Sequence, residues 1–380
     1  MKRIFLLLLV LILISSQGCI KPEPVLKDTG IRIVELRGNP YEIGYQHGKE
    51  LKEEIQYFSH RIEKLIIYKT ILKTAKELAE EFGKTYPEFK ELIEEMKGIS
   101  NGAEVPYENI LLFNLMDEIV LNYYWKISII GCSAFVFRNK DGNLIIGRNL
   151  DYGVFVNELP LCPVIFKYYP EKGNPFISIS FPGLVGAYTG ISKNLYISIN
   201  VSQSHKTNMG APECLITRKI IQYSNSIDEA LENALYPYQG LNLLIADDKK
   251  AVVLEISPRK KAIRELDKER FLVITNHFQH PEMISEQAEK LIEELPTPVD
   301  GTFVRQINTK EREKIIREMI SSKEEIDVEY GKEILKNVST RLTLQSIIYL
   351  PFQRKLFIAK NTTSPVSYGE WLEFNLKLLL

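Results

Sequence analysis

The chain has 380 residues, of which 45% are hydrophobic and 26% are charged, and its formal net charge is −1. This composition is typical of a globular protein and excludes an intrinsically disordered one. Because positive charge is not in excess, the chain lacks the electrostatic attraction on which nucleic-acid binding depends, and no nucleic-acid partner is expected. The length admits one large domain or two ordinary ones.

The first 19 residues follow the pattern of an export signal. Two basic residues precede an apolar run over residues 4–14, and small residues then lead to Gly18 and Cys19. The run is short for a membrane span and has the proportions of a signal peptide. Gly18-Cys19 resembles a lipobox, in which the cysteine is lipidated and becomes the mature N-terminus, although Ser16 replaces the usual leucine. We therefore expect an exported protein, either secreted or anchored through lipid on Cys19 to the outer face of the cell membrane.

The segment 20–131 is predicted to be mainly helical. One alternating strand pattern occupies residues 28–37, and Gly38-Asn39-Pro40 ends it. Glu, Lys, Leu and Ile then recur at helical spacing as far as residue 97, with a break near residues 83–87. We expect a charge-dense helical hairpin that buries one face and leaves the other in solvent.

Three polar residues of this segment could be read as functional. His47 lies in the first helical pattern, between Gly44 and Gly48, which permit close helix packing. We interpret it as a structural histidine. Asp117 and Glu118 are an adjacent acidic pair, for which ion pairing at a helix surface or between domains is preferred to catalysis.

Strand patterns dominate from residue 131 onward and alternate with helical patterns. Helices are expected at 212–223, 227–235, 283–295, 303–320 and 330–337, and strands at 132–138, 143–148, 163–169, 176–181, 195–201, 241–247, 251–256, 262–265, 271–275, 343–350 and 354–360. Strands, then helices, then further strands predict an α+β fold with helices outside two sheets.

The first two of these strands form a predicted hairpin that carries chemistry. Asp141-Gly142 between two apolar runs is a strong hairpin signal. The hairpin brings Cys132 close to Arg148 and Asp151, near its open end. A thiol beside a guanidinium and a carboxylate is a plausible nucleophile, because nearby positive charge favours the thiolate. On local sequence alone, a buried structural cysteine with a surface ion pair explains the same residues.

The spacing of Cys132, Arg148 and Asp151 resembles the start of the mature chain in the choloylglycine hydrolase and penicillin V acylase family. There the matching cysteine is freed as the N-terminal residue and serves as the nucleophile. The long helical segment ahead of Gly131, and the phrase from Arg37 to Gly48, look more like the isopenicillin N acyltransferase branch (peptidase family C45) of these N-terminal-nucleophile hydrolases. Acid ceramidase and N-acylethanolamine acid amidase are more distant members of the group.

This resemblance implies a four-layer αββα sandwich that is activated by autocatalytic cleavage between Gly131 and Cys132. Residues 20–131 would be a propeptide that stays bound as a small subunit, and residues 132–380 would be the catalytic core. The enzyme would be an amidohydrolase or acyltransferase that cleaves a linear carboxamide of a small molecule through an acyl-enzyme on Cys132. The acyl group, and whether water or an amine accepts it, stay open.

Three further site residues follow from the resemblance alone. Asn200, in the segment that begins at Gly190, matches the family asparagine that helps to form the oxyanion hole. Asn276 matches the second such asparagine. Arg305, in Thr302-Phe303-Val304-Arg305, matches an arginine that lies near the nucleophile, although threonine replaces the usual serine of that segment.

The chemistry of such a site is coherent. An N-terminal cysteine brings its own base, because an α-amine has an unperturbed pKa of about 7.7–8.0. Arg148 and Asp151 would hold the amine and the thiolate in place. Asparagine amides would donate to the oxyanion of the tetrahedral intermediate, and losing one such donor typically costs about 10²–10³ in rate. No metal or cofactor is expected.

Two other readings compete with this one. A papain-like thiol hydrolase would pair Cys132 with His205, His277 or His280 as its base, but no local cysteine-protease signature is present. A noncatalytic surface lipoprotein would bind a ligand or partner. A zinc site at His277 and His280 is weakly indicated, because the spacing is not that of a known zinc motif and no third ligand is apparent.

Two cysteines have no role in this scheme. Cys162 and Cys214 remain once Cys19 and Cys132 are assigned. An exported protein could join them in a disulfide, and two buried thiols explain them equally well.

Overall fold

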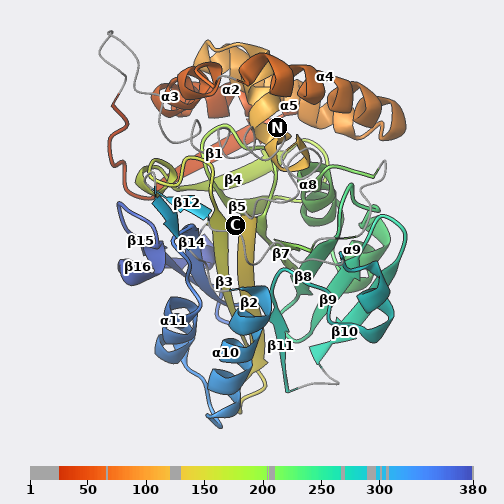
Figure 1. The fold of residues 1–380 in the computed structure, drawn as a ribbon, viewed down its shortest axis with the longest axis vertical. Helices are drawn as coiled ribbons and strands as arrows, with labels where there is room; N and C mark the ends of the chain where they lie inside the picture. The colour runs from red at the N-terminus through yellow and green to blue at the C-terminus, as the bar shows by residue number, and fades with distance from the viewer. Residues whose placement is uncertain are drawn as a thin grey trace.

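The computed structural model describes residues 25–65, 67–119, 130–202, 204, 210–266, 270–288, 297–299, 302–304 and 308–378. In this part of the chain two β-sheets pack face to face, and helices cover the outer face of each (Figure 1). The layers run helix, sheet, sheet, helix. The predicted α+β class and its αββα sandwich are therefore confirmed.

The first sheet contains the predicted hairpin at its centre. Its six strands follow the order β11-β2-β3-β14-β15-β16, with β11 at Phe271–Ile274, β2 at Ile130–Arg138, β3 at Leu144–Tyr152, β14 at Thr343–Leu350, β15 at Lys355–Lys360 and β16 at Glu370–Asn375. All of these neighbours pair in antiparallel fashion. Gly142 makes the tight turn between β2 and β3 with a φ of +82°, a conformation that glycine adopts at no steric cost.

The second sheet has eight strands in the order β1-β4-β5-β6-β7-β8-β9-β10. Their bounds are β1 Arg32–Gly38, β4 Val164–Pro170, β5 Phe176–Ser180, β6 Thr189–Ser192, β7 Tyr196–Val201, β8 Leu241–Ala246, β9 Ala251–Ile256 and β10 Lys261–Glu265. Along β7 the side chains alternate between the two faces, as in any strand. Ile197, Ile199 and Val201 pack under the helices, whereas Tyr196 belongs to the core between the sheets.

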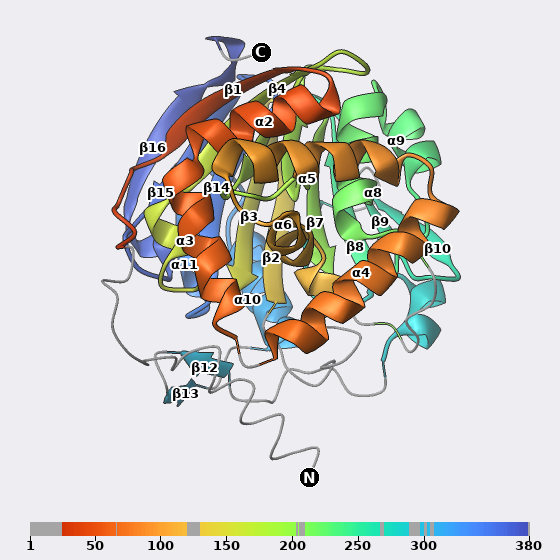
Figure 2. The ribbon, with the colours of Figure 1, turned by 90° about the horizontal axis from the view of Figure 1, so that it is seen from above.

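Helices close the sandwich on both sides. The eight-stranded sheet is covered by α2 (Pro40–Glu50), α3 (Lys52–Glu63), α4 (Tyr68–Thr85), α5 (Phe89–Ala103), α6 (Tyr107–Asn114), α8 (Glu213–Tyr223) and α9 (Ile227–Asn233). Figure 2 shows α2 to α5 as the layer in front of the strands. The six-stranded sheet packs against α10 (Thr309–Ser321) and α11 (Val328–Asn337), which lie at the opposite end of the molecule in Figure 1.

The segment before Cys132 is built into the fold. Its predicted strand is β1, which pairs in parallel with β4 and forms the edge of the eight-stranded sheet. Its helices α2 and α5 cross closely, since a Cβ on Gly44 would overlap the carbonyl oxygen of Glu95 and one on Gly48 would overlap that of Ile99. The close packing predicted for these glycines is confirmed.

Some element boundaries differ from the sequence pattern. Helix α10 begins at Thr309, because the Asn308 side chain caps it by accepting a hydrogen bond from the Glu311 amide at 2.8 Å. The residues ahead of it form β13 (Thr302–Val304), which pairs with β12 (Thr297–Val299). Where the helix predicted over 283–295 would begin there is a 3₁₀ helix at Pro281–Glu286, and residues 289–296 lie outside the described part. Strands β6 and β16 were not predicted.

In the described part of the chain no helix combines the length and the apolar character needed to cross a bilayer.

Candidate active site

Cys132 lies in β2 and is 1% exposed. On the hairpin, Cys132 pairs with Leu150 and Ala134 pairs with Arg148, so Cys132 and Arg148 share the sheet face that points into the core between the sheets. The Arg148 Nη2 atom is 3.9 Å from the Cys132 Sγ atom and donates to the Ile199 carbonyl at 2.8 Å. The structure thus brings the predicted thiol and guanidinium together.

Arg148 is fixed by an unpredicted glutamine. Gln345, on β14, accepts from the Arg148 Nη1 atom at 3.2 Å and from the Thr189 hydroxyl at 2.6 Å, and its own amide donates to the Ile179 carbonyl at 3.0 Å. The β3–β14 register shifts between Thr343 and Gln345. Such an irregularity re-aims side chains beside a site.

Burial dominates the electrostatics of the thiol. It raises the pKa of Cys132 to about 11, although the Arg148 guanidinium lowers it in part. In the uncleaved chain the thiol is therefore protonated at neutral pH. A nucleophilic role needs a nearby group that accepts its proton.

Asp151 lies against the predicted cleavage site. It pairs with Gly131 across the hairpin, and a Cβ on Gly131 would lie 3.0 Å from the Asp151 Oδ2 atom. Its Oδ1 atom accepts from the Thr343 hydroxyl at 2.6 Å, while Oδ2 has no hydrogen-bond partner. Burial raises the pKa of Asp151, and the Arg312 guanidinium opposes that rise. Glycine at 131 lets the carboxylate approach the peptide bond that precedes Cys132.

Of the two predicted asparagines, Asn276, which follows β11, contacts Cys132 directly, whereas Asn200 contacts the end of β11. The Cys132 backbone N–H donates to the Asn276 Oδ1 atom at 2.8 Å, and the Asn276 amide donates to the Val201 carbonyl at 2.8 Å. Asn200 projects from β7 and donates to the Ile274 carbonyl at 3.3 Å. The buried Asn200 Oδ1 atom has no hydrogen-bond partner.

Arg312, which the sequence analysis missed, completes the cluster. From α10 it donates to the Cys132 carbonyl at 2.6 Å, the Ser133 hydroxyl at 2.8 Å and the Asn276 Oδ1 atom at 2.8 Å. The Arg312 Nη1 atom is 3.8 Å from the Asp151 Oδ2 atom. A signal was present, because Arg312 falls on the buried stripe of an amphipathic helix, at helical spacing from Ile316 and Ile320. The predicted Arg305 lies outside the described residues.

Both ring nitrogens of His277 contact groups other than the Cys132 thiol. Its Nδ1 atom lies 2.9 Å from the Thr309 hydroxyl, and its Nε2 atom lies 2.9 Å from the Glu313 Oε2 atom. Burial would raise the pKa of Glu313, but its hydrogen bonds with His277 and Arg317 outweigh burial and lower it to about 2. This geometry gives the papain-like reading no support. His205 lies outside the described residues.

The interpretation of Asp117 and Glu118 as surface or interdomain ion-pairing residues is wrong. Glu118 is buried and accepts from the Glu213 backbone N–H at 2.8 Å. Asp117 accepts from the Tyr152 hydroxyl at 2.8 Å. Burial raises the pKa of Asp117 to about 6 and, together with Asp117, that of Glu118 to about 8.

The two cysteines that have no role in the predicted mechanism do not form a disulfide. Cys162 and Cys214 are both free and buried, so the alternative of two buried thiols holds. Burial raises the pKa of Cys162 and of Cys214 above the ordinary thiol value, which makes them unreactive.

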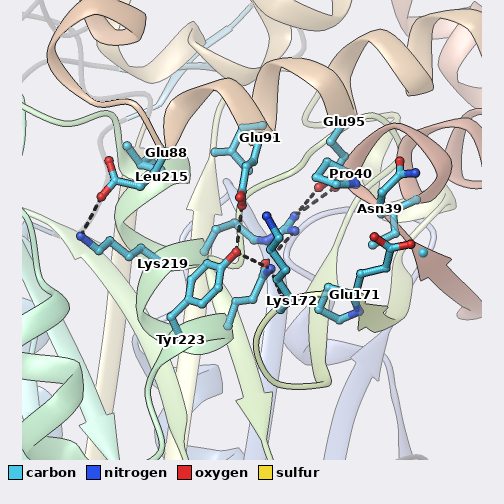
Figure 3. A pocket seen from close by; sticks show the side chains of 16 residues that line it. Asn39, Pro40, Glu88, Glu91, Glu95, Glu171, Lys172, Leu215, Lys219 and Tyr223 are labelled. Atoms are coloured by element: carbon cyan, nitrogen blue, oxygen red, sulfur yellow. Dashed lines mark hydrogen bonds and ion pairs between the residues drawn. The ribbon is translucent and has the colours of Figure 1, made fainter.

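A separate cavity lies between the N-terminal helices and α8 (Figure 3). Its volume is about 140 Å³, and its walls come from the β1–α2 junction, α5, the β4–β5 turn and α8. The Lys219–Glu88 ion pair spans it at 3.2 Å, and the Tyr223 hydroxyl donates to Glu91 at 2.8 Å. None of the residues grouped around Cys132 lines it.

Comparison with known proteins connects this geometry to a family. A family profile described as "Acyl-coenzyme A:6-aminopenicillanic acid acyl-transferase" matches residues 137–363, more than half of the chain. Arg148, Asp151, Asn200 and Asn276 fall within the match, and Cys132 lies five residues ahead of it.

The individual relatives have low sequence identity to this chain. An uncharacterized protein of Archaeoglobus fulgidus is 27% identical over 351 residues, which cover 75% of this chain and 58% of that protein. Protein dcd1B of Dictyostelium discoideum is 31% identical over 54% of this chain and 45% of its own length. Acid ceramidase of Bos taurus is 29% identical over 40% of each chain. The matches thus span about half the length of these relatives.

Proposed function

We propose that this chain, which belongs to the acyl-coenzyme A:6-aminopenicillanic acid acyl-transferase family and with it to the N-terminal-nucleophile hydrolases, is an enzyme that acts on linear carboxamides through an acyl-enzyme on Cys132. Hydrolysis and acyl transfer share that intermediate and differ in whether water or an amine resolves it. The names of the relatives, an acyl-transferase and a ceramidase, support an acyl group held in amide linkage.

One observation carries the proposal. The Cys132 thiol has the guanidinium of Arg148 at 3.9 Å, while the backbone nitrogen of the same residue is held by Asn276 at 2.8 Å. Cleavage before Cys132 would turn that nitrogen into an α-amine, and the amine would then stay beside the sulfur. An α-amine with a pKa of about 7.7–8.0 is a suitable base for the thiol at neutral pH.

Self-cleavage would follow the same geometry. The Cys132 sulfur bonds to the Gly131 carbonyl carbon, the peptide C–N bond breaks, and the thiol proton ends on the released nitrogen. Water then hydrolyses the thioester and leaves Gly131 as a carboxylate. The Oδ2 atom of Asp151, which accepts no hydrogen bond and lies beside Gly131, would relay the proton, a role that its raised pKa suits.

The segment before Cys132 would remain as a subunit. It supplies the edge strand β1 and the buried Glu95 carboxylate, which pairs with the Arg218 guanidinium of α8 at 3.0 Å. The His47 Nε2 atom accepts from the Gly183 N–H at 2.9 Å, and burial lowers the pKa of His47 to about 3, which keeps the ring neutral. The cavity in Figure 3 also has walls from both segments.

Chain length tests the proposal. Purified wild-type protein should give two fragments on a denaturing gel, with the second beginning at Cys132, and Cys132→Ala should remain one folded, inactive chain. Mass spectrometry with amide substrates should find the acyl group on Cys132. Wild-type protein that stays uncut and is nevertheless fully active would refute the mechanism.

Export is proposed on the sequence alone, because residues 1–24 lie outside the described part. Intact-mass analysis of native protein should show loss of residues 1–18 and a lipid on Cys19. An unprocessed chain that begins at Met1 would reject this proposal.

A further inference from the structure

The inner face of β7 is polar, whereas most of the core between the sheets is apolar. Tyr196, Ser198 and Asn200 alternate with apolar residues that pack under the helices, and Ser202 continues the alternation. The side chains of all four are buried. The Asn200 Oδ1 and Ser202 Oγ atoms have no hydrogen-bond partner among the described residues, and the Tyr196 and Ser198 hydroxyls have none there apart from a weak contact with each other.

Two more unpartnered atoms lie next to this row. Asn242 pairs with Asn200 across β7 and β8, and its Oδ1 atom is also unpartnered. The Arg148 Nε atom is unpartnered too, and the same guanidinium donates to the Ile199 carbonyl at 2.8 Å. Burial raises the pKa of Tyr196 to about 12, while the Arg148 charge and a weak hydrogen bond with Ser198 oppose the rise, so these three groups are neighbours.

Leaving all of these groups unsatisfied would be too costly for a stable fold. An unpaired buried polar group costs about 1–3 kcal/mol, so the set would cost an amount comparable to the whole stability of a typical domain, about 5–15 kcal/mol. These atoms must therefore have partners from outside the protein.

Water is the molecule that fits their chemistry. Arg148 Nε only donates, the asparagine Oδ1 atoms only accept, and the hydroxyls do both. A single ion cannot satisfy such a mixture, whereas water donates and accepts twice. Side chains on one face of a strand follow each other at about 6.6 Å, which two hydrogen bonds through one water nearly span.

We infer that the inner face of β7 binds a file of ordered water that reaches Cys132 from between the sheets and supplies the water that resolves the acyl-enzyme. This inference rests on the proposed function of Cys132. The Arg148 guanidinium joins the row to the sulfur, because it contacts Ile199 of β7 and the Cys132 Sγ atom through the same nitrogen. At the other end Tyr196 stacks on Tyr349, whose hydroxyl accepts from the half-buried Arg354 at 3.3 Å.

The step is a balanced hydrolysis. The water oxygen bonds to the acyl carbon of the thioester and the C–S bond breaks. One water proton passes through the Cys132 α-amine to the departing sulfur. The products are the free carboxylic acid and the restored thiol, and no other reactant is needed.

Partition between water and an added amine tests the inference. With an amide substrate and hydroxylamine, Ser198→Val should lower the ratio of acid to hydroxamate about tenfold, the equivalent of one hydrogen bond's net contribution, with little change in acyl-enzyme formation. Ser198→Ala, which leaves room for water, should lie between Ser198→Val and wild type. The control is Ser178→Val, the same change at a buried serine on the other face of the sheet. An unchanged ratio in Ser198→Val overturns the inference.

A crystal structure of the wild-type protein gives a second test that does not depend on the variants folding. Waters hydrogen-bonded to Ser198 Oγ and Asn200 Oδ1 support the file. A halide in their place, or Ser198 Oγ and Asn200 Oδ1 atoms bonded only to protein groups, overturns it. An acyl group that never forms on Cys132 overturns the proposed function instead, whereas a normal acyl-enzyme in a dry core removes only the water file.

Discussion

Two buried arginines mark two regions of this molecule, and they are used differently. Arg218, under the N-terminal helices, pairs with the Glu95 carboxylate at 3.0 Å and lies over the Tyr168 ring at 4.6 Å. Arg148, between the sheets, is equally buried. Among the described residues its hydrogen-bond acceptors are the Gln345 side chain, the Ile199 carbonyl and the Cys132 sulfur, and none of them is a carboxylate.

The difference distinguishes an arginine that stabilises the fold from an arginine that could take part in chemistry. A buried cation with a carboxylate partner is neutralised, and it joins the two segments that carry the pair. A buried cation that is held by neutral groups keeps its charge for a negative charge that develops later. Burial raises the pKa of the Cys132 thiol to about 11, so under the proposed mechanism Arg148 would meet a thiolate only during the reaction.

The largest expected effect comes from breaking the neutralised pair. Glu95→Ala leaves Arg218 buried without a counter-charge, which should cost about 3–5 kcal/mol in free energy of unfolding. Denaturant unfolding measures this. Glu94→Ala, next along the helix and in an exposed pair with Lys97, should cost within about 1 kcal/mol. A Glu95 variant as stable as the Glu94 variant would show that the pair is dispensable.

Removing the other arginine should affect activity more than stability. Arg148→Met should lower kcat/KM by about 10²–10³, as expected for loss of one preorganised donor, in protein that still folds. His277→Ala is the matched control, because His277 is bonded to Thr309 and Glu313. Its loss should fall short of the about 10²–10⁴-fold effect of removing a general base. The reverse ranking of the two variants would favour a papain-like mechanism.

Giving Arg148 a carboxylate should make it resemble Arg218. Gln345→Glu places a negative charge at the acceptor that lies 3.2 Å from the Arg148 Nη1 atom. The guanidinium would then favour the thiolate less, and the pKa of Cys132 should rise by about one unit. The pH profile of Cys132 alkylation measures the shift. Gln345→Met, which adds no charge, should shift the profile less, and equal profiles for both variants would exclude the electrostatic role.

The sequence predicted the parts of this site that depend on local spacing. The hairpin turn at Gly142 and the alternation along β2 and β3 place Cys132 near Arg148 without knowledge of the rest of the fold. The α+β class, with helices outside two sheets, followed from the order of strand and helix patterns, and the αββα sandwich followed from the family resemblance. These features are set by neighbours in the chain, and their periods are visible in one sequence.

What the sequence missed depends on contacts between distant segments. Gln345 reaches Arg148 across a strand pair with a shifted register, and Arg312 reaches Cys132 from a helix 180 residues later. Neither has a motif of its own. Asp117 and Glu118 were misread because their burial comes from the tertiary packing of Tyr152 and α8 around them, which composition does not reveal.

Those two acids form a third kind of buried charge site. Asp117, Glu118 and Glu213 meet beside Tyr152 and Tyr188. The pKa of Glu213 is raised well above its usual value, first by burial and then by the two neighbouring acids. Among the described residues no cation pairs with this cluster, so it should respond to pH more than either arginine region does.

The effect expected of this cluster is a pH dependence of stability, which is gradual over several pH units. The folded pKa of Glu118 is about 8, above the ordinary value of about 4.3 for an unfolded glutamate. Between those values the folded state keeps a proton that the unfolded state has released, so the free energy of unfolding falls as pH rises, by at most about 1.4 kcal/mol per pH unit for this group. The stability that protonated Glu118 contributes is therefore fully present below the unfolded pKa and is lost as the pH rises above the folded pKa. Glu118→Gln should reduce the fall of Tm with rising pH, measured by thermal unfolding between about pH 5 and 8.5. Glu77→Gln, on the exposed side of α4, should leave that pH dependence of Tm unchanged. Parallel slopes for wild type and Glu118→Gln would mean that Glu118 is ionised in the folded chain, and the cluster would then have to contain a compensating charge.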